Sequence, residues 1–294
     1  MTYRELYDYG AEQLKKADIT EAALDARLLL EYICHTDRNT LLVHGESERS
    51  LIEEEFYKKT IEKRSAHIPL QHITGEQEFM GLVFRVNEHT LIPRQDTEIL
   101  VEEAMRYMGD GMRILDLCTG SGCILLSLLK YSNECEGIGI DISNKALLVA
   151  RENARRLGLD AVFLEGDLFE PLKDFVSERT HEKLFDIIIS NPPYIASGVI
   201  PSLMPEVRDH EPLIALDGAG DGLHFYRKIV EEAPFHMRRG AMIFLEIGYD
   251  QADAVSCILR ESGFGEIEVI KDYAGLDRVV KASMLQTLTK QNGR

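Results

Sequence analysis

The spacing of apolar residues changes once along the chain. Up to about residue 70, apolar residues recur at helical spacing, and residues 18–35 and 48–67 carry broad apolar faces on this period. From about residue 95 onward, short apolar runs typical of buried strands alternate with amphipathic helical patterns. We therefore predict a small helical domain over residues 1–72, followed by an α/β domain over residues 95–284.

The helical part contains a start signal and candidate inward positions. Asp18 and Glu21 have the spacing of a capping box at the start of a helix. In the second helical segment we expect Leu51, Phe56 and Ile61 to face inward. These short amphipathic helices are expected to pack together as a bundle.

The segment 73–94 differs from both of these parts. Gly75 and Gly81 punctuate short β-prone pieces, in which apolar residues alternate with Arg85. We predict a β-hairpin here that links the two domains.

Seven strands are expected in the α/β part, at residues 113–117, 136–141, 161–167, 184–190, 241–248, 267–272 and 278–283. Helical patterns precede or separate most of them, at residues 97–108, 123–131, 144–158, 222–237 and 251–263. Repeated strand–helix units indicate a mostly parallel sheet that is covered on both faces. The last two strands are joined by only about six residues, too few for a parallel crossover. We therefore predict an antiparallel hairpin at the end of the sheet, followed by a C-terminal tail at residues 285–294.

A glycine turn follows the first strand of the α/β part. In the segment RILDLCTGSGCILLSLL, Asp116 lies near the end of the strand, and Gly120 and Gly122 lie in the turn before a helix. Glycines let the backbone approach a ligand closely, and a helix start offers unpaired N–H groups. The turn is a candidate cofactor site, and a tight βα turn without a ligand is the alternative.

Two kinds of cofactor compete for this turn. A dinucleotide prefers G-x-G-x-x-G, and Leu125 occupies the position of the third glycine. An adenosyl-sulfonium cofactor has no phosphates and depends more on carboxylates. Asp141, which ends the next strand, is placed to accept hydrogen bonds from both ribose hydroxyls, while Asp167 and Leu168 suit the adenine amino group and ring. The carboxyl ends of parallel strands face one crevice, so we favour the adenosyl cofactor.

The segment FDIIISNPPYIA ends a further buried strand in a rigid turn. A planar amide or aryl-amine nitrogen is a weak nucleophile, and groups that accept hydrogen bonds from it return electron density to it. The Asn191 side-chain oxygen and the Pro192 carbonyl are two such acceptors in a frame held by Pro193, and the Tyr194 ring can lie on a planar partner. We predict methyl transfer to a planar nitrogen, driven by in-line alignment rather than by a general base. A turn that merely ends a strand is the alternative.

The net charge bears on which nitrogen is methylated, because this turn suits adenine, guanine and glutamine alike. The chain has 33 Lys and Arg against 50 Asp and Glu, a net charge of −17. Nucleic-acid binding draws much of its affinity from basic groups, and no basic target-reading segment follows the sheet. A nucleic-acid N-methyltransferase is therefore the disfavoured alternative.

Five separated motifs closely resemble the release-factor glutamine methyltransferases, the PrmC/HemK family: PLQHITGEQEFMGLVFRV, LIPRQDTEILVE, SNPPYIA, HEPLIALDGAGDGLHFYRKI and YAGLDRVV. The resemblance covers essentially the whole chain. It implies a Rossmann-like class I methyltransferase that uses S-adenosyl-L-methionine, releases S-adenosyl-L-homocysteine, and carries an N-terminal helical domain that docks the substrate. Such enzymes N5-methylate the glutamine of the GGQ motif in class-1 peptide chain release factors.

Matching the family motifs residue by residue assigns two sets of site residues. The cofactor set is Cys118, Thr119, Gly120, Ser121, Gly122, Asp141, Asp167, Leu168 and Asn191. The substrate set is Asn191, Pro192, Pro193 and Tyr194, and catalysis is assigned to Asn191, Pro192 and Tyr194. The chain departs from the family pattern at Cys118, where glycine is usual, and at Gln95, where proline is usual. Arg94 and Glu98 are left open between pairing across domains and ligand contact.

Further residues and alternatives stay open. Glu246 lies at a strand tip, where its carboxylate either contacts the substrate or pairs with polar groups of a loop. His210, Glu211 and Asp217 either line the mouth of the site or lie in a solvated loop. A non-catalytic adenosyl-binding module and a dinucleotide oxidoreductase remain as rival functions.

The partners and location are expected as follows. We expect class-1 release factors as partners, no DNA, no membrane contact, no metal, no disulfide and a monomeric state. No apolar run approaches the roughly 20 residues of a membrane span, and the first residues lack the layout of a signal peptide, so a cytoplasmic location is the default expectation.

Overall fold

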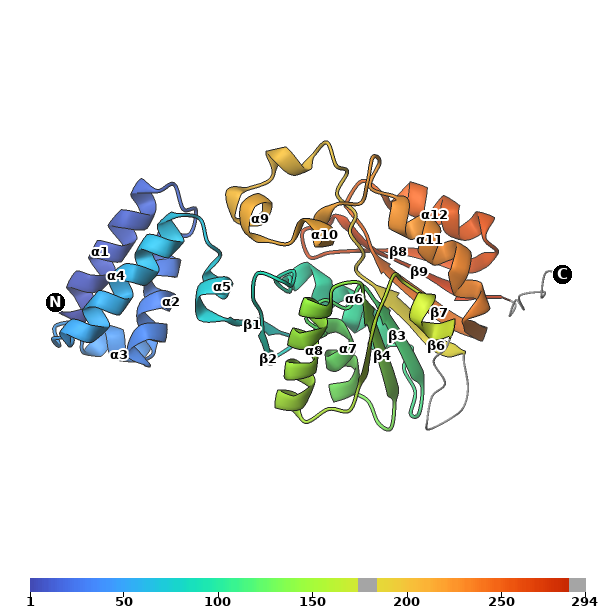
Figure 1. Ribbon diagram of the computed structural model, residues 1–294, viewed down its shortest axis with the longest axis horizontal. Coiled ribbons are helices and arrows are strands. Elements are labelled where there is room, and N and C mark those ends of the chain that lie inside the picture. The colour runs from blue at the N-terminus through green and yellow to red at the C-terminus, as the bar shows by residue number, and fades with distance from the viewer. Residues whose placement is uncertain (174–183, 286–294) are drawn as a thin grey trace. The chain divides into compact units, whose positions relative to one another are not determined.

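The computed structural model describes residues 1–173 and 184–285, which form two compact units. One unit comprises residues 1–76 together with residues 204–210, and the other comprises the described residues between 77 and 203 and those from 211 to 285. The C-terminal tail expected from residue 285 lies outside the described residues, apart from Leu285 itself. Figure 1 shows the elements of each unit.

The first unit is helical. It contains α1 (Tyr3–Lys16), α2 (Ala22–Cys34), α3 (Arg38–Val43), α4 (Leu51–Ser65), α5 (Leu70–Thr74) and α9 (Pro205–His210). Capping boxes start α1 at Thr2 and α4 at Ser50, where each hydroxyl accepts from a backbone N–H three residues on. The core contains Leu6, Leu29 and Tyr57, which are fully buried.

Two expectations for this unit are wrong. The capping box at Asp18 is absent, because Asp18 lies in a left-handed conformation and α2 starts after Glu21 without a side-chain cap. Leu51 is 82% exposed and Phe56 is 56% exposed, whereas Ile61 is buried as expected. The turns of α4 that follow Ser50 therefore present apolar side chains to solvent. The expectation was wrong because the helical period alone does not say which face meets the other helices.

The predicted β-hairpin is present as β1 (Glu76–Phe79) and β2 (Leu82–Arg85). Its turn residues Met80 and Gly81 both have positive φ, the backbone that two-residue hairpins favour. The carboxylate of Glu98 accepts from the Met80 backbone N–H at 2.6 Å. Glu98 therefore holds the hairpin turn.

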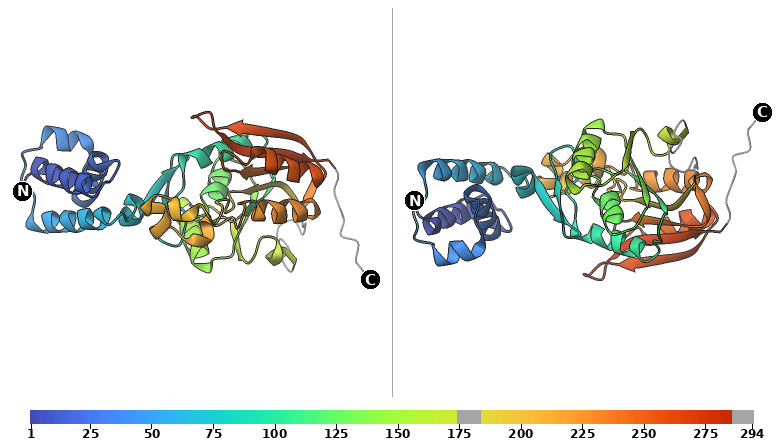
Figure 2. Two further views of the ribbon diagram at one scale, coloured as in Figure 1. Left: turned by 90° about the horizontal axis from the view of Figure 1, so that it is seen from above. Right: turned by 90° about the horizontal axis from the view of Figure 1, so that it is seen from below.

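Seven strands form one sheet in the order β5-β4-β3-β6-β7-β9-β8. They are β3 (Arg113–Leu117), β4 (Glu136–Asp141), β5 (Val162–Glu165), β6 (Phe185–Ser190), β7 (Met237–Glu246), β8 (Phe264–Lys271) and β9 (Asp277–Met284). All neighbours from β5 to β7 pair in parallel, whereas β9 runs antiparallel to both β7 and β8. Figure 2 shows β8 and β9 in red at one edge. The mostly parallel sheet with an antiparallel end is confirmed.

Helices cover both faces of the sheet (Figure 1). One face carries α6 (Gln95–Met105), α7 (Cys123–Lys130) and α8 (Asn144–Leu157), and the other carries α11 (His224–Glu232) and α12 (Ala252–Glu261). In β6, Ile187 and Ile189 pack into one core, and Phe185 and Ile188 pack into the other. This burial on both faces explains why the strand reads as a continuous apolar run.

The loops of this unit contain short elements that the apolar period did not predict. They are η1 (Glu170–Lys173), η2 (Ile200–Ser202), α10 (Leu213–Leu216) and η3 (Ala233–Phe235). The helix expected over residues 222–237 ends at Glu232, because Pro234 cannot continue the backbone ladder. Strand β7 then begins at Met237, earlier than the expected residue 241.

The strand order places a switch point beside β3. The chain runs outward from β3 through β4 to β5, and then returns to β6 on the other side of β3. Ligands of such sheets bind beyond the carboxyl ends of the strands at this point. Among residues 1–173 and 184–285, no helix is both long and apolar enough to cross a membrane.

Candidate active site

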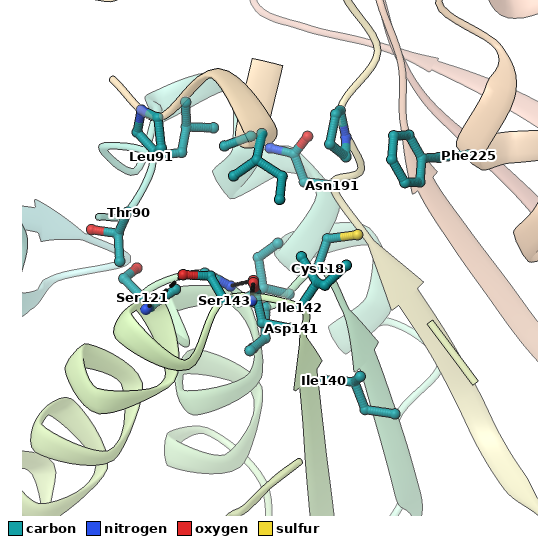
Figure 3. Close-up of a pocket in the computed structure, with 18 of the residues that line it drawn as sticks. Thr90, Leu91, Cys118, Ser121, Ile140, Asp141, Ile142, Ser143, Asn191 and Phe225 are labelled. Carbon is teal, nitrogen blue, oxygen red and sulfur yellow. Dashed lines mark hydrogen bonds between the residues drawn. The ribbon is translucent and has the colours of Figure 1, made fainter. Parts of the chain in front are cut away.

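A cavity opens at the carboxyl ends of β3, β4, β5 and β6, where the switch point lies (Figure 3). Its walls come from the loops that follow these strands, from the segment before α6 and from α10 and α11. The predicted site residues among them are Cys118, Thr119, Gly120, Ser121, Asp141, Asp167, Leu168, Asn191 and Pro193. The structure thus brings most of the predicted cofactor set to the same cavity.

The loop after β3 leaves room for a ligand. Gly120 has a φ of 56°, and a Cβ added there would have no atom within 4 Å. Gly122, the remaining predicted residue, has a φ of 79°, and a Cβ there would lie 3.2 Å from the Cβ of Ala150 in α8. Glycine at 122 thus serves the close packing of two helices as well as the turn.

Asp141 connects this loop to the tip of β4. Its Oδ2 accepts from the Gly120 N–H at 2.9 Å, and its Oδ1 accepts from the Ser143 N–H at 2.8 Å. Burial raises the pKa of Asp141, and the two N–H donors act in the opposite direction. A carboxylate has lone pairs beyond these two bonds, so Asp141 can still accept from hydroxyl groups of a ligand.

Asp167 and Leu168 follow β5, as the sequence pattern indicates. Asp167 forms an ion pair with Lys228 at 2.6 Å, a partner from α11 that the sequence did not suggest. Leu168 is buried and has a φ of 49°, so the backbone turns sharply at the cavity wall.

The segment 191–194 follows β6. Asn191 and Pro193 line the cavity, and the side-chain Nδ2 of Asn191 donates to Thr97 Oγ1 at 3.3 Å. Pro192 is buried but is not among the cavity residues. Tyr194 is also not among the cavity residues, and its hydroxyl donates to Glu246 Oε1 at 3.3 Å. The hydroxyl end of the ring that the sequence suggested for stacking is thus held by Glu246.

Two buried carboxylates lie close to these loops. Asp116 accepts from the Thr119 hydroxyl at 2.5 Å, and its Oδ1 has no hydrogen-bond partner. Burial raises the pKa of Asp116 to about 7. Glu246 at the end of β7 is 2% exposed, and burial raises its pKa to about 7 as well. Each of these carboxyls therefore keeps a substantial share of its protons near pH 7, unlike an exposed carboxyl.

The residues left open by the sequence fall into different places. Arg94 lines the cavity and forms an ion pair with the buried Glu211 of the same unit. Asp217 accepts from the Ser197 hydroxyl and the Ala219 N–H, and His210 contacts the Ala66 carbonyl within the helical unit. Neither Asp217, His210 nor Glu211 is among the residues that line the cavity.

Several lining residues were not singled out by sequence, namely Thr97 and, as labelled in Figure 3, Thr90, Leu91, Ile142 and Phe225. Ile142 follows Asp141 directly and is 53% exposed, so an apolar side chain next to a carboxylate at a strand tip was a usable signal. The other four come from segments whose place beside the cavity depends on the tertiary fold.

These residues fit an adenosyl cofactor. Gly120 leaves open space, Asp141 offers acceptors, and apolar side chains such as Ile142 and Phe225 line the same cavity. An uncharged ring with a hydroxylated sugar needs this mixture of surfaces. Within residues 1–173 and 184–285, no group of three or more His, Cys, Asp or Glu side chains is placed to hold a metal ion.

Comparison with known proteins identifies the family. The PrmC N-terminal domain family matches residues 5–75, and a methyltransferase domain family matches residues 108–215. A release factor glutamine methyltransferase of Thermodesulfovibrio yellowstonii is 42% identical over 269 residues, which are 89% of this chain and 94% of the relative. The chain belongs to the release factor glutamine methyltransferase family. A family member of Clostridium acetobutylicum is 44% identical over 266 residues, covering 88% of this chain and 90% of the relative.

A solved structure agrees on the fold of this family member. The hMettl16 catalytic domain is 15% identical, with a TM-score of 0.55, over 76% of this chain and 83% of that chain. At this identity the likeness concerns the fold alone. The family relationship, rather than this likeness, makes the chain an enzyme of the methyltransferase class, and its structure combines a Rossmann-like sheet with an N-terminal helical region.

Proposed function

We propose that this enzyme transfers the methyl group of S-adenosyl-L-methionine to the N5 side-chain amide of the GGQ glutamine in class-1 peptide chain release factors. One observation carries the proposal: the carboxamide of Asn191 lies on the cavity that Asp141 and the glycine loop also line. An acceptor for amide N–H groups and acceptors for an adenosyl cofactor therefore share one cavity (Figure 3). The names of the relatives support glutamine as the target.

Methyl transfer requires mainly that the protein orient the glutamine amide and the cofactor toward each other. S-adenosyl-L-methionine, when bound, supplies an electrophilic methyl group and leaves as S-adenosyl-L-homocysteine. The Asn191 Oδ1 and the Pro192 carbonyl accept hydrogen bonds from the glutamine amide, which raises the electron density on its nitrogen. Alignment of this kind supplies on the order of 7 to 11 kcal/mol of a barrier. The amide proton is lost to water, because the methylated amide cation is a strong acid.

Cofactor binding is proposed for the loop of residues 118–122, together with Asp141, Asp167, Leu168 and Asn191. Asp141 takes the ribose hydroxyls, and Leu168 packs on the adenine ring. The ion pair of Asp167 with Lys228 leaves one carboxylate oxygen for the adenine amino group. A pocket of this kind fixes the ligand through a few placed polar groups within an apolar lining.

We also propose that residues 1–72 dock the release factor. None of the described residues that line the cavity belongs to this segment. Its solvent-facing side chains include several large apolar ones, namely Leu42, Val43, Leu51, Ile52 and Phe56. Because Ile52 and Phe56 are four residues apart in α4, they lie on the same side of that helix. A protein substrate needs such a surface, whereas a free glutamine does not.

The test of the reaction uses methyl-labelled S-adenosyl-L-methionine with four acceptors. These are a class-1 release factor, the same factor with its GGQ glutamine replaced by alanine, duplex DNA and ribosomal RNA. We expect label in the native factor alone, on the glutamine side chain by mass spectrometry. Label in the nucleic acids, and none in the factor, would support the alternative of a nucleic-acid N-methyltransferase and overturn the proposal.

Two variants, each with a matched control, accompany this test. Asn191→Ala should abolish transfer while the release factor still binds, whereas Asn133→Ala, which changes an exposed asparagine before β4, should behave as wild type. For docking, the double variant Ile52→Ser with Phe56→Ser should raise KM for the factor without changing cofactor affinity. Leu148→Ser, which alters an exposed leucine of α8, is the matched control. An unchanged KM in the double variant argues against docking through α4.

A further inference from the structure

The side-chain amide of Gln251 holds the backbone of three loops in the α/β unit. Gln251 directly precedes α12, and its Nε2 donates to the Tyr194 carbonyl at 3.0 Å and to the Gly222 carbonyl at 3.3 Å. Its Oε1 accepts from the Gly248 N–H at 2.9 Å, and the Tyr226 hydroxyl lies 3.4 Å from the same oxygen. One amide thus joins the loop after β6, the loop before α11 and the loop after β7.

The partners of this amide leave it one orientation. The Gly248 N–H can only donate, so it must meet the amide oxygen. The Tyr194 and Gly222 carbonyls can only accept, so they must meet the amide nitrogen. Turning the amide over would oppose like groups at all three contacts. The Tyr194 carbonyl therefore receives an N–H donor of defined position.

Two of the three loops lead into the cavity. Asn191, upstream of Tyr194, and Phe225, downstream of Gly222, both line it (Figure 3). Gln251 itself is not among the described residues that line the cavity. Its amide therefore acts on the site through the backbone that it holds, without touching a ligand.

The turn at Gly222 packs directly on Tyr194. Gly222 has a φ of 74°, and a Cβ added there would lie 2.4 Å from the Tyr194 carbonyl oxygen and 2.7 Å from Gln251 Nε2. A Cβ added at Gly218 would lie 2.8 Å from the Tyr194 Cα. Only glycine allows two backbones to approach so closely. The Tyr194 peptide group is thus fixed by packing as well as by a hydrogen bond.

A fixed Tyr194 carbonyl also fixes the residues before it. The rings of Pro192 and Pro193 lock their φ angles, and a residue that precedes proline has little backbone freedom. The segment therefore transmits a displacement of Tyr194 to the Pro192 carbonyl instead of absorbing it. At the other end of the segment, Asn191 Nδ2 donates to Thr97 Oγ1 at 3.3 Å. Both ends of the segment 191–194 are thus held.

We propose that Gln251 is a positioning residue, whose amide holds the Tyr194 carbonyl and thereby sets where the segment 191–194 meets the substrate amide. This inference rests on the proposed function. Gly222 supplies the second carbonyl and the close packing that keep the amide in place. In-line methyl transfer depends on the position of the acceptor nitrogen, and a misplacement of about 1 Å can cost on the order of 100-fold in rate. Gln251 thus affects turnover rather than binding.

The decisive experiment compares Gln251→Glu and Gln251→Met with wild type at about pH 8.5, where a carboxyl of ordinary pKa is ionised. Glutamate keeps an oxygen for the Gly248 N–H and opposes its second oxygen to the Tyr194 carbonyl, whereas methionine fills a similar space without either contact. We expect kcat to fall about 10- to 100-fold in Gln251→Glu and less, about 10-fold, in Gln251→Met. The KM for the release factor and the Kd of the cofactor should stay unchanged, because docking and cofactor binding are proposed for other segments.

Gln77→Glu is the matched control. Gln77 in β1 also donates through its Nε2 to a carbonyl, that of Glu78 at 2.7 Å, but this bond is exposed to solvent. The control should keep the wild-type kcat. A wild-type kcat in Gln251→Glu overturns the inference. A larger loss in Gln251→Met than in Gln251→Glu also overturns it, because the contact with Gly248 would then be the one that matters.

Gly222→Ala tests the same support and decides the matter if neither Gln251 variant folds. Its control is Gly111→Ala, at a glycine with a φ of 73° where an added Cβ meets no atom within 4 Å. Both alanines adopt an unfavourable left-handed backbone, but only the one at position 222 presses on the Tyr194 carbonyl. We expect kcat to fall about 10-fold or more in Gly222→Ala and to stay at the wild-type value in Gly111→Ala. Equal kcat values in these two variants contradict the inference.

The wild type separates this inference from the proposed function. Failure of the wild type to methylate release factor would defeat the proposed function and the inference with it. An active wild type whose kcat survives in both Gln251→Glu and Gly222→Ala would defeat the inference alone.

Discussion

The backbone N–H of Gly120 donates a 2.9 Å hydrogen bond to Oδ2 of Asp141, so the glycine loop after β3 is attached to the tip of β4. The other carboxylate oxygen holds the Ser143 N–H at the start of α8. Asp141 thus fixes two loops while both of its oxygens keep lone pairs for the cavity. Its role in holding the loop and its proposed role in holding ribose are combined in one side chain.

Asp141→Asn should weaken the binding of S-adenosyl-L-methionine about 10- to 100-fold. An amide has one acceptor oxygen instead of two and carries no charge, so either a loop N–H or the ribose loses its partner. Isothermal titration calorimetry measures the change in Kd. Asp160→Asn, at an exposed position after α8, is the control and should bind as wild type. Equal Kd values for both variants would contradict the role given to Asp141.

Cys118 has a φ of 60° at the position where the family usually has glycine. This left-handed conformation costs a residue with a Cβ on the order of 1 kcal/mol. Cys118→Gly and Cys118→Ala both remove the thiol, but only glycine relieves the strain. Cys118→Gly should therefore be about 1 kcal/mol more stable than Cys118→Ala in urea unfolding. A Cys118→Ala variant at least as stable as Cys118→Gly would rule out strain at this position.

Gln95 is the first residue of α6 and is exposed, and Arg94 before it has an extended backbone with a ψ of 148°. Proline is favoured at the first helical position, and the residue before a proline prefers this extended backbone. Gln95→Pro should raise the free energy of unfolding by about 0.4 to 1 kcal/mol, because the unfolded chain loses freedom. Thermal unfolding measures the effect.

The companion variant is Asp96→Pro, one residue further into α6. It tests whether a gain in the free energy of unfolding is specific to proline at the first helical position. A loss of stability in Gln95→Pro would mean that the N–H of Gln95 has a partner that matters to the fold.

Asp116 should make the protein less stable as the pH rises. Burial raises its pKa from 3.8 to about 7 in the folded state, so the folded state binds the proton more tightly than the unfolded state. The contribution of the protonated Asp116 to the free energy of unfolding is fully present below pH 4, and it is lost as the pH rises through about 7. Between pH 5 and pH 8 the loss is on the order of 3 kcal/mol.

Asp116→Asn removes this titration. Compared with wild type, the variant should gain relative stability on going from pH 5 to pH 8, as measured by denaturant unfolding at each pH. Asp160→Asn serves as the control, since its side chain is exposed. A constant difference between Asp116→Asn and wild type across this range would mean that Asp116 does not retain its proton in the folded state.

The strand–helix alternation was readable because both faces of the sheet are covered. Segments such as residues 185–190 therefore form continuous apolar runs, and the short link before β9 leaves only an antiparallel pairing. The positions of Leu51 and Phe56 were not readable, because the helical period identifies an apolar face without saying what covers it. The four- and six-residue helices α10 and α9 are too short to show a period of their own.

The sequence by itself determined the order of strands and helices, the glycine loop, and the carboxylate and asparagine at strand tips. Each of these depends on residues adjacent in the chain. Only the tertiary structure decided that the Thr97 hydroxyl accepts from Asn191, and that the Tyr194 hydroxyl donates to Glu246. These residues come from α6, β7 and the loop after β6, and their contacts exist only because the sheet brings distant strand ends together.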